Sequence, residues 1–345
     1  MIALMMSMTM IIVMFAGCGS SAGEVYVYSY GDYFDPAIMD QFEAETGIRV
    51  VLDSYDTAEE MFTVIENEAT SYDCICTSDY MIEKMISEDM LAELDKSNIP
   101  NIDNLADVYM QKSEVFDPGN KYSVPHVVGV AGLLYNTKMT GGNKITSWDA
   151  LWNPDFTDQI VMPDSVRDAF MIALRKLGYS QNTTEESEIS AAAAELEAQK
   201  KMVYKYANDS ARDLLADGSA AIGVVWNGEY MYTKDLNEDV AFVVPEEGSE
   251  FFIDSWIIPS NAANKENAEL WIDFLCRADI AAQNFEYLYY TTPNEAAYEL
   301  IDDEALAEEA IFPSEETLAR CESLRMLDSD TTELYSNYWK EVKAN

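Results

Sequence analysis

The chain has 345 residues, 48% of them hydrophobic, which is enough to form the cores of two domains. Its balance of 63 Asp and Glu against 21 Lys and Arg gives a formal net charge of −42. This charge disfavours a nucleic-acid partner, whose phosphates would be repelled, and favours a cationic ligand. Solubility or a saline habitat would explain the acidic excess equally well.

Residues 1–23 differ in composition from the rest of the chain, because no charged side chain precedes Glu24. The apolar run at residues 1–16 is shorter than the roughly 20 residues that span a bilayer and is typical of a secretory signal. "FAGC", residues 15–18, resembles a bacterial lipoprotein cleavage box, although no Lys or Arg precedes it and Phe15 stands where Leu is usual. We therefore expect residues 1–23 to be a lipoprotein signal and tether, with the lipid on Cys18. An ordinary cleaved signal and a buried terminal helix are the alternatives.

Four further cysteines follow, and they do not have metal-binding spacing. Cys74 and Cys76 share one face of a predicted strand, and His126 is the only histidine in the sequence. A zinc site is therefore not expected, and buried free thiols are the better interpretation. A disulfide between Cys276 and Cys321 stays open in an exported protein.

The first part of the chain alternates between strand and helix patterns. Apolar alternation predicts strands at residues 24–30, 48–55 and 72–78. A helical pattern follows each strand, at residues 37–46, 58–69 and 80–90. Asp35 is expected to cap the first of these helices and Gly47 to end it, while Thr57 and Glu60 form a capping box for the second. This order predicts a parallel α/β sheet.

A looser region at residues 94–121 leads into a long β-rich run at residues 122–136 and then into a second α/β series. This series predicts a strand at 159–164, a helix at 165–178, one continuous helix at 183–206, a strand and helix within 218–236, and two strands within 239–262. Two helices, a "YYTTPN" turn and C-terminal helices close the chain, and there is no internal repeat.

Aromatic and acidic side chains recur where these strands end. The set comprises Tyr30, Asp32, Tyr33, Ser78, Asp79, Tyr80, Asp164, Ser165, Asp168, Trp226, Phe252, Asp254, Tyr289 and Tyr290, with Arg167 as the cationic exception. Ligands of open α/β sheets bind beyond the carboxyl ends of the strands. Aromatic faces attract ammonium groups and pack on methylenes, and carboxylates anchor the ammonium ends. Each position taken singly could be core packing or a helix cap, so the prediction of a slender cationic ligand depends on the recurrence.

Several long segments resemble a known family. They are "QFEAETGIRV", "SWDALWNPDF", "RKLGYSQNTTEESEI", "WNGE", "IDSWIIPSNAANKENA" and "YYTTPNEAA". The chain resembles, from about residue 25 to 344, the spermidine/putrescine-binding proteins of bacterial polyamine ABC importers. The resemblance implies a two-lobe periplasmic-binding-protein fold with two hinge crossings, each lobe being a central sheet flanked by helices. It also implies a polyamine ligand, delivery to membrane permease subunits, no cofactor, and an extracytoplasmic location. We expect lobe 1 at residues 24–129 plus 254–298, lobe 2 at residues 130–253 plus 299–345, and a monomer.

The resemblance also implies site residues. The aromatic walls fall on Tyr30, Tyr33, Tyr80, Trp226, Phe252 and Tyr290, the amine-anchoring acids on Asp168 and Asp254, and a hydroxyl contact on Ser78. Asp32 and Ser165 are weaker candidates. Tyr30 and Phe252 stand where spermidine-binding members have Trp, and Ser165 stands where they have an Asp. Losing that carboxylate makes a diamine such as putrescine at least as suitable as spermidine. A further polar contact falls near Leu324 or Arg325 and is not assigned.

Three other functions are weighed against a polyamine receptor. A ferric-iron binder of the same broad fold would use Tyr289 and Tyr290 as phenolate ligands. A sugar or amino-acid binder is the second, and an amino-acid carboxylate would need Arg167. Paired acids at Asp164 and Asp168 could imitate a glycosidase dyad, but no catalytic motif accompanies them, so we expect no enzyme.

Overall fold

The computed structural model describes residues 23–31, 33–67, 70–208 and 210–344. The predicted signal, its lipidation site Cys18 and the candidate contact Asp32 lie outside the described residues. The described strands are β1 (Gly23–Tyr30), β2 (Ile48–Tyr55), β3 (Cys74–Thr77), β4 (Ser123–Asn136), β5 (Ile160–Met162), β6 (Val203–Tyr206), β7 (Ile222–Trp226), β8 (Val240–Val243) and β9 (Phe251–Ile257). The described α-helices are α1 (Ala37–Thr46), α2 (Ala58–Glu66), α3 (Asp79–Ser87), α4 (Asp107–Ser113), α5 (Val166–Lys176), α6 (Glu186–Lys200), α7 (Ala211–Ala216), α8 (Gly228–Leu236), α9 (Lys265–Leu275), α10 (Ala278–Leu288), α11 (Asp303–Leu306), α12 (Glu315–Ala319) and α13 (Ser329–Ala344).

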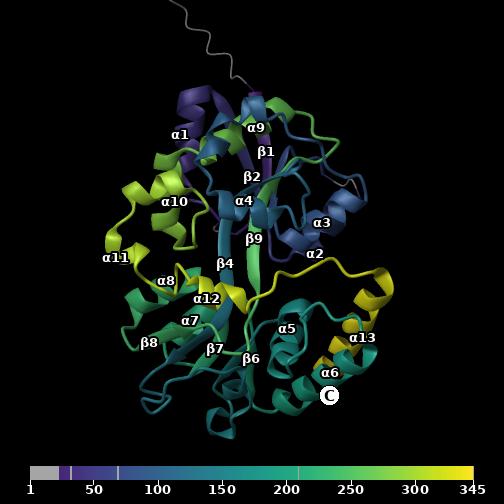
Figure 1. Cartoon of the computed structure of the whole chain (residues 1–345), viewed down its shortest axis with the longest axis vertical. Coiled ribbons are helices and arrows are strands. Elements are labelled where there is room, and N and C mark those ends of the chain that lie inside the picture. Colours follow the sequence, from purple (N-terminus) through teal and green to yellow (C-terminus); the bar gives the residue numbers. More distant parts are fainter. Residues whose placement is uncertain (1–22, 32, 68–69, 209, 345) are drawn as a thin grey trace, which may run out of the picture.

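The described strands form one sheet in the order β2-β1-β3-β9-β4-β7-β5-β6, with β8 also paired to β4. Its outer strands are parallel, whereas β4 and β9 are antiparallel to each other and to their other neighbours. The first part of β4 pairs with β9, and its second part, from Ala131 to Asn136, pairs with β7 and β8. Figure 1 shows β4 and β9 running lengthwise through the middle, with α1, α2, α3 and α9 at one end and α5, α6, α7 and α8 at the other. These two strands therefore join two lobes.

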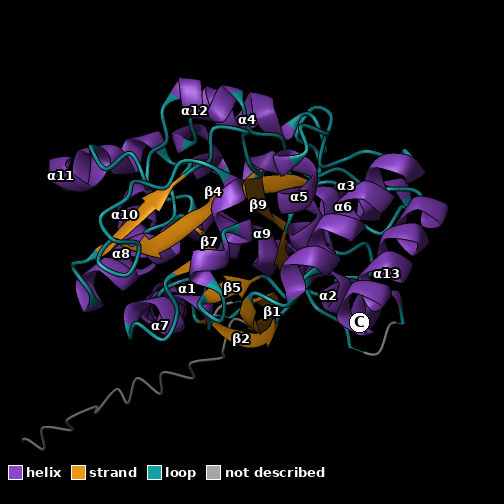
Figure 2. Cartoon of the chain, turned by 90° about the horizontal axis from the view of Figure 1, so that it is seen from below, coloured by secondary structure: helices purple, strands orange, loops and turns teal. Residues whose placement is uncertain are grey.

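Each lobe buries both faces of its part of the sheet under helices, and Figure 2 shows the strands enclosed in this way. In the first lobe, Val25 and Val27 of β1 pack with Phe42 of α1 and Trp271 of α9. The alternate residues of β1 face α2 and α3, where the ring of Tyr28 stacks on that of Tyr72 at 4.3 Å. Because successive side chains of a strand point to opposite faces, the Val-Tyr alternation of β1 supplies both cores at once.

The second lobe is built in the same way. Phe170 of α5, Leu196 of α6 and Tyr335 of α13 are buried on one face of the sheet. Leu215 of α7 and Tyr230 of α8 are buried on the other face. The C-terminal helix α13 therefore completes the core of this lobe.

The local signals predicted most element boundaries. The carboxylate of Asp35 accepts a hydrogen bond from the backbone N–H of Ala37 at 2.9 Å, and Gly47 ends α1 with a left-handed φ of 74°. Thr57 Oγ1 accepts from the backbone N–H of Glu60 at 3.2 Å, as the capping box predicts.

The prediction of one helix over residues 183–206 is wrong. The helix α6 ends at Lys200, and Val203–Tyr206 forms β6, which pairs in parallel with β5. β-Branched and aromatic residues favour a strand once a neighbouring strand edge is available. That edge comes from residues about forty positions earlier in the chain, so the local pattern could not reveal it.

The four cysteines in the described part of the chain are free. Cys74 and Cys76 are fully buried in β3, as predicted. Cys276 belongs to the core beside α9, whereas Cys321 packs at the opposite face of the sheet. The question of a bond between Cys276 and Cys321 is thus answered: they do not pair.

The turn before β9 provides a test of this packing. Gly248 has a φ of +85°, and an added Cβ would lie 1.9 Å from the carbonyl oxygen of Arg320. Gly218 has a similar φ of +76°, but an added Cβ would meet nothing within 4 Å. Both Ala substitutions place an L-residue in the left-handed region of φ, which destabilises the folded state by about 1–2 kcal/mol. We expect Gly248→Ala to lower the midpoint of thermal unfolding clearly more than the matched control Gly218→Ala; equal losses would contradict the packing described.

Candidate ligand-binding site

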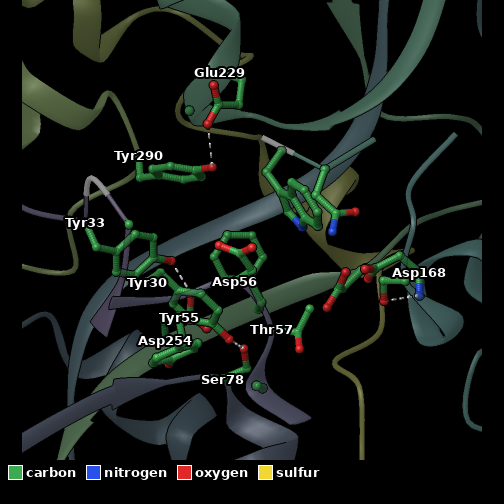
Figure 3. A pocket seen from close by; sticks show the side chains of 18 of the residues that line it. Tyr30, Tyr33, Tyr55, Asp56, Thr57, Ser78, Asp168, Glu229, Asp254 and Tyr290 are labelled. Atoms are coloured by element: carbon green, nitrogen blue, oxygen red, sulfur yellow. Dashed lines mark hydrogen bonds between the residues drawn. The ribbon is translucent and has the colours of Figure 1, made fainter. Parts of the chain in front are cut away.

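A cavity of about 440 Å³ lies at the junction of the two lobes. All nine predicted site residues line it: Tyr30, Tyr33, Ser78, Tyr80, Asp168, Trp226, Phe252, Asp254 and Tyr290. Ser165 lines it as well. The structure therefore brings the predicted set together in one place, and Figure 3 shows how several of these side chains surround the same space.

One wall of the cavity is built around Asp254 of β9. The phenol of Tyr33 donates a hydrogen bond to Asp254 Oδ2, and the rings of Tyr30 and Tyr33 lie 5.1 Å apart (Figure 3). Asp254 is only 5% exposed, and its Oδ1 has no hydrogen-bond partner among the described residues. Burial raises the pKa of Asp254 to about 6, although the hydrogen bond from Tyr33 acts in the opposite direction. The carboxylate of Asp254 is therefore poorly solvated, and only one of its two oxygens accepts a hydrogen bond from the described part of the chain.

A second acidic wall is built around Asp168, in the first turn of α5. Ser165 caps this helix, and its Oγ accepts from the backbone N–H of Asp168 at 3.5 Å. Burial raises the pKa of Asp168 to about 6, with repulsion from Glu59 adding to the effect. Ser165 is thus explained as a helix cap that also reaches the cavity wall.

Aromatic rings close the space between these acids. Tyr290 lies 6.1 Å from both Tyr33 and Phe252, measured between ring centroids. Tyr80 donates its phenol proton to Glu59 Oε1 at 3.0 Å, and the guanidinium carbon of Arg167 lies 5.6 Å from the ring of Tyr80.

The sequence interpretation missed several residues of the cavity wall. They include Tyr55, Asp56, Thr57, Glu59, Asn208, Arg212, Glu229, Tyr232, Glu250 and Leu288. Tyr55 is the last residue of β2, and Asp56, Thr57 and Glu59 follow it, so the rule that ligands bind beyond the carboxyl ends of strands would have found them. Glu229 Oε2 pairs with Arg212 at 2.8 Å, and its Oε1 accepts from the phenol of Tyr290 at 3.4 Å (Figure 3).

Leu324 and Arg325, near which the unassigned contact was expected, differ in their surroundings. Leu324 lines the cavity, whereas Arg325 forms a two-point ion pair with Glu83 of α3. Glu83 also accepts from the backbone N–H of Met326 at 2.9 Å. The carbonyl oxygen of Arg325 in turn accepts from Arg167 at 3.1 Å. Arg325 therefore does not oppose a ligand but ties the second lobe to a helix of the first.

The geometry does not favour the alternative sites. Tyr290 faces the cavity, but Tyr289 adopts a left-handed φ of 57° after α10 and packs on Phe285, so the two phenols do not converge. In the described ranges, no group of three or more His, Cys, Asp or Glu side chains is placed to hold a metal. Asp164 pairs with Lys343 at 2.8 Å and, unlike Asp168, does not line the cavity.

A family model supplies the observation that decides the affiliation. Residues 70–311 match the model of the bacterial extracellular solute-binding proteins. The chain belongs to this family. No helix in the described part of the chain is both long and apolar enough to cross a membrane.

Individual family members sharpen the comparison. The chain is 35% identical over 332 residues to the spermidine/putrescine-binding periplasmic protein of Salmonella typhimurium, covering 96% of this chain and 94% of that protein. A solved spermidine/putrescine ABC transporter protein of Listeria monocytogenes is 35% identical with a TM-score of 0.89, covering 93% of this chain and 98% of that one. The substrate-binding protein PotD of Streptococcus pneumoniae is 33% identical with a TM-score of 0.81, covering 94% and 99%. The predicted two-lobe fold and the family resemblance are confirmed.

The pair between Glu83 and Arg325 provides a test of how the lobes are held together. Removing a partly exposed ion pair weakens the contact by about 1 kcal/mol, enough to shift a two-state equilibrium several-fold. We expect Arg325→Ala to raise the radius of gyration of the unliganded protein in small-angle X-ray scattering because the lobes separate. Arg49→Ala is the control, since Arg49 pairs with Glu24 within one lobe. Unchanged scattering in Arg325→Ala would show that this pair does not hold the lobes.

Proposed function

We propose that the protein is the extracytoplasmic substrate-binding protein of an ABC importer and captures a polyamine, putrescine or spermidine, between its lobes. The observation that carries this proposal is one aromatic-walled cavity lined by two carboxyl groups, the buried Asp254 and the half-buried Asp168, each with a pKa raised to about 6. An ionised carboxylate without a partner is unfavourable in such a site. A protonated amine at each carboxylate would remove this cost.

The negative charge of the cavity wall supports the proposal that the ligand is a cation. Six acids line it against two arginines, a formal balance of 2 − 6 = −4: Asp56, Glu59, Asp168, Glu229, Glu250 and Asp254 against Arg167 and Arg212. Both arginines are already engaged, Arg212 by Glu229 and Arg167 by Asn182 and the carbonyl oxygen of Arg325. An amino-acid carboxylate could thus pair only with Arg167, and it would meet the excess of acids on the same wall.

The aromatic rings support a slender, flexible cation rather than a sugar. Tyr30, Tyr33, Phe252 and Tyr290 surround Asp254, so an ammonium bound there would lie against ring faces and its methylenes would pack on the neighbouring rings. Each cation–π contact contributes about 0.5–2 kcal/mol. A neutral sugar would also leave the acidic excess of the wall without a counter-charge, which a cation supplies.

The mechanism we propose is capture, closure and transfer, with no bond made or broken. The lobes comprise residues 24–129 plus 254–298 and residues 130–253 plus 299–345, and the hinge lies where β4 changes its partner from β9 to β7. The protein acts as a monomer, tethered through lipid on Cys18, and presents its closed form to the membrane permease. The names of the relatives in Salmonella and Streptococcus support the polyamine and the importer.

Removing the acidic anchors should abolish tight binding. Asp254→Asn and Asp168→Asn each remove a charge-assisted hydrogen bond, so we expect affinity for putrescine or spermidine to fall about 10- to 100-fold. Asp164→Asn is the matched control, since Asp164 lies outside the cavity wall and pairs with Lys343. Isothermal titration of the soluble part with putrescine, cadaverine, spermidine and spermine would measure this. A folded wild-type protein that gives no heat with any of them would refute the proposed function.

Affinity and stability should respond to pH in opposite directions. Burial raises the pKa of Asp254 and that of Asp168 to about 6, and amines bind the ionised forms. Between pH 7.5 and 5 we expect affinity to fall about tenfold for each of these carboxylates. The unliganded protein binds more protons when folded than when unfolded in this range, so its free energy of unfolding should rise as pH falls. Calorimetric titration measures the affinity and thermal unfolding measures the stability, each across this pH range at constant ionic strength. An affinity that does not change with pH would contradict the assignment of Asp254 and Asp168 as the groups that bind the amines.

A further inference from the structure

Glu250 is a buried acid of the cavity wall that neither the strand-end pattern nor the family resemblance assigns. It immediately precedes β9, and its carbonyl oxygen accepts from the backbone N–H of Ala131 at 3.2 Å. A bridge to Glu322 holds it on the other side. The residue is 6% exposed and lines the cavity, and its Oε2 has no hydrogen-bond partner within the described ranges. Its main chain is therefore fixed while its carboxyl group is left unsatisfied at the cavity.

The charged groups that face Glu250 are mostly of the same sign. Asp168 and Arg167 of α5, Asp79 of α3 and Asp254 of β9 all act on it electrostatically. Asp168 is the strongest of these influences. Arg167 is the one cation of the set, and it is held by Asn182 and by the carbonyl oxygen of Arg325. The carboxyls of Glu250 and Asp168 thus lie on one wall with too little positive charge to neutralise both.

We propose that Glu250 is a further ligand-binding residue, which together with Asp168 forms a seat for one protonated amine of the polyamine. The empty seat holds a proton on this carboxyl pair. The incoming ammonium replaces that proton, which passes to solvent, so the pair ends with two ionised carboxylates around one ammonium. This inference rests on the proposed function, because it assigns where one ammonium of the same ligand binds.

The physical basis is the cost of two negative charges on one cavity wall, one on the buried Glu250 and one on the half-buried Asp168. Burial, followed by repulsion from Asp168, raises the pKa of the Glu250 carboxyl well above its usual range. Two interacting acids in one site hold a shared proton until a cation stabilises both ionised forms. Asp254 differs because the phenol of Tyr33 donates a hydrogen bond to its Oδ2, and its pKa is raised only to about 6. The two ends of the ligand therefore meet different seats, and only the seat at Glu250 gives up a proton near neutral pH.

Titration calorimetry at pH 7.5 in two buffers with different ionisation heats, phosphate and Tris, separates proton release from binding. We expect putrescine to release a measurable fraction of a proton from the wild-type protein and clearly less from Glu250→Gln. At this pH Asp254 and Asp168, with pKa values of about 6, are already ionised and contribute little. The affinity of Glu250→Gln should fall about 10- to 100-fold, since a charge-assisted hydrogen bond is lost.

Glu43→Gln is the matched control, because Glu43 is exposed on α1 and does not line the cavity. Its affinity and proton release should equal those of the wild type. Thermal unfolding checks that Glu250→Gln is folded, and we expect a midpoint at or above that of the wild type, since Gln keeps the volume and is neutral without having to take up a proton on folding.

The outcomes separate the two proposals. Equal affinity and proton release in Glu250→Gln and wild type would overturn the seat at Glu250 while leaving the polyamine function in place. If Glu250→Gln does not fold, the wild-type measurement still decides, because binding without proton release at pH 7.5 would overturn the seat. Absence of heat with putrescine and spermidine in the wild type would instead refute the proposed function itself.

Discussion

The property on which the cleft depends is the burial of carboxyl groups without enough positive charge to neutralise them. Asp254 and Glu250 are almost inaccessible, and each has an oxygen with no hydrogen-bond partner among the described residues. In the empty protein this arrangement reduces stability, because buried acids must either carry an unpaired charge or hold a proton. A cation of the right length removes both costs at once. The destabilising feature of the empty protein is therefore the source of its selectivity for a cation.

The scaffold places these groups by running two strands through both lobes. β9 is antiparallel to β3, so its amino end meets the carboxyl ends of β1 and β3 at the cleft, and Glu250, Phe252 and Asp254 reach the cavity from one strand. Asn227, fully buried after β7, accepts from the backbone N–H of Val130 at 3.1 Å and donates to the carbonyl oxygen of Ile311 at 3.1 Å. The amide thus joins the long strand β4 to the returning C-terminal segment beside Trp226.

Sequence patterns predicted most of the fold because strand alternation, capping residues and glycine stops are local signals. The candidate site followed from one topological rule, that ligands bind beyond the carboxyl ends of strands, together with the family resemblance, and all nine of the predicted residues line the cavity. Glu59 was missed because the end of β2 was not surveyed, and Glu250 because it lies at the amino end of an antiparallel strand, where the rule does not apply. β6 and the pair of Glu83 with Arg325 depend on contacts between distant parts of the chain, and no local pattern encodes those.

The length of the ligand depends on how many ammonium groups the cavity can bind, and this number is smaller than the number of acids that line it. Ser165 lacks the carboxylate that the resemblance led us to expect, and this absence favoured a diamine. Glu250 restores an acid beside Asp168, but both serve one ammonium, so the number of seats stays at two. Glu229 offers no independent third seat, because Arg212 and Tyr290 already hold its two oxygens. A ligand with a central amine would thus place that amine against aromatic rings rather than a carboxylate, and the separation between Asp254 and the seat at Glu250 becomes the quantity that selects chain length.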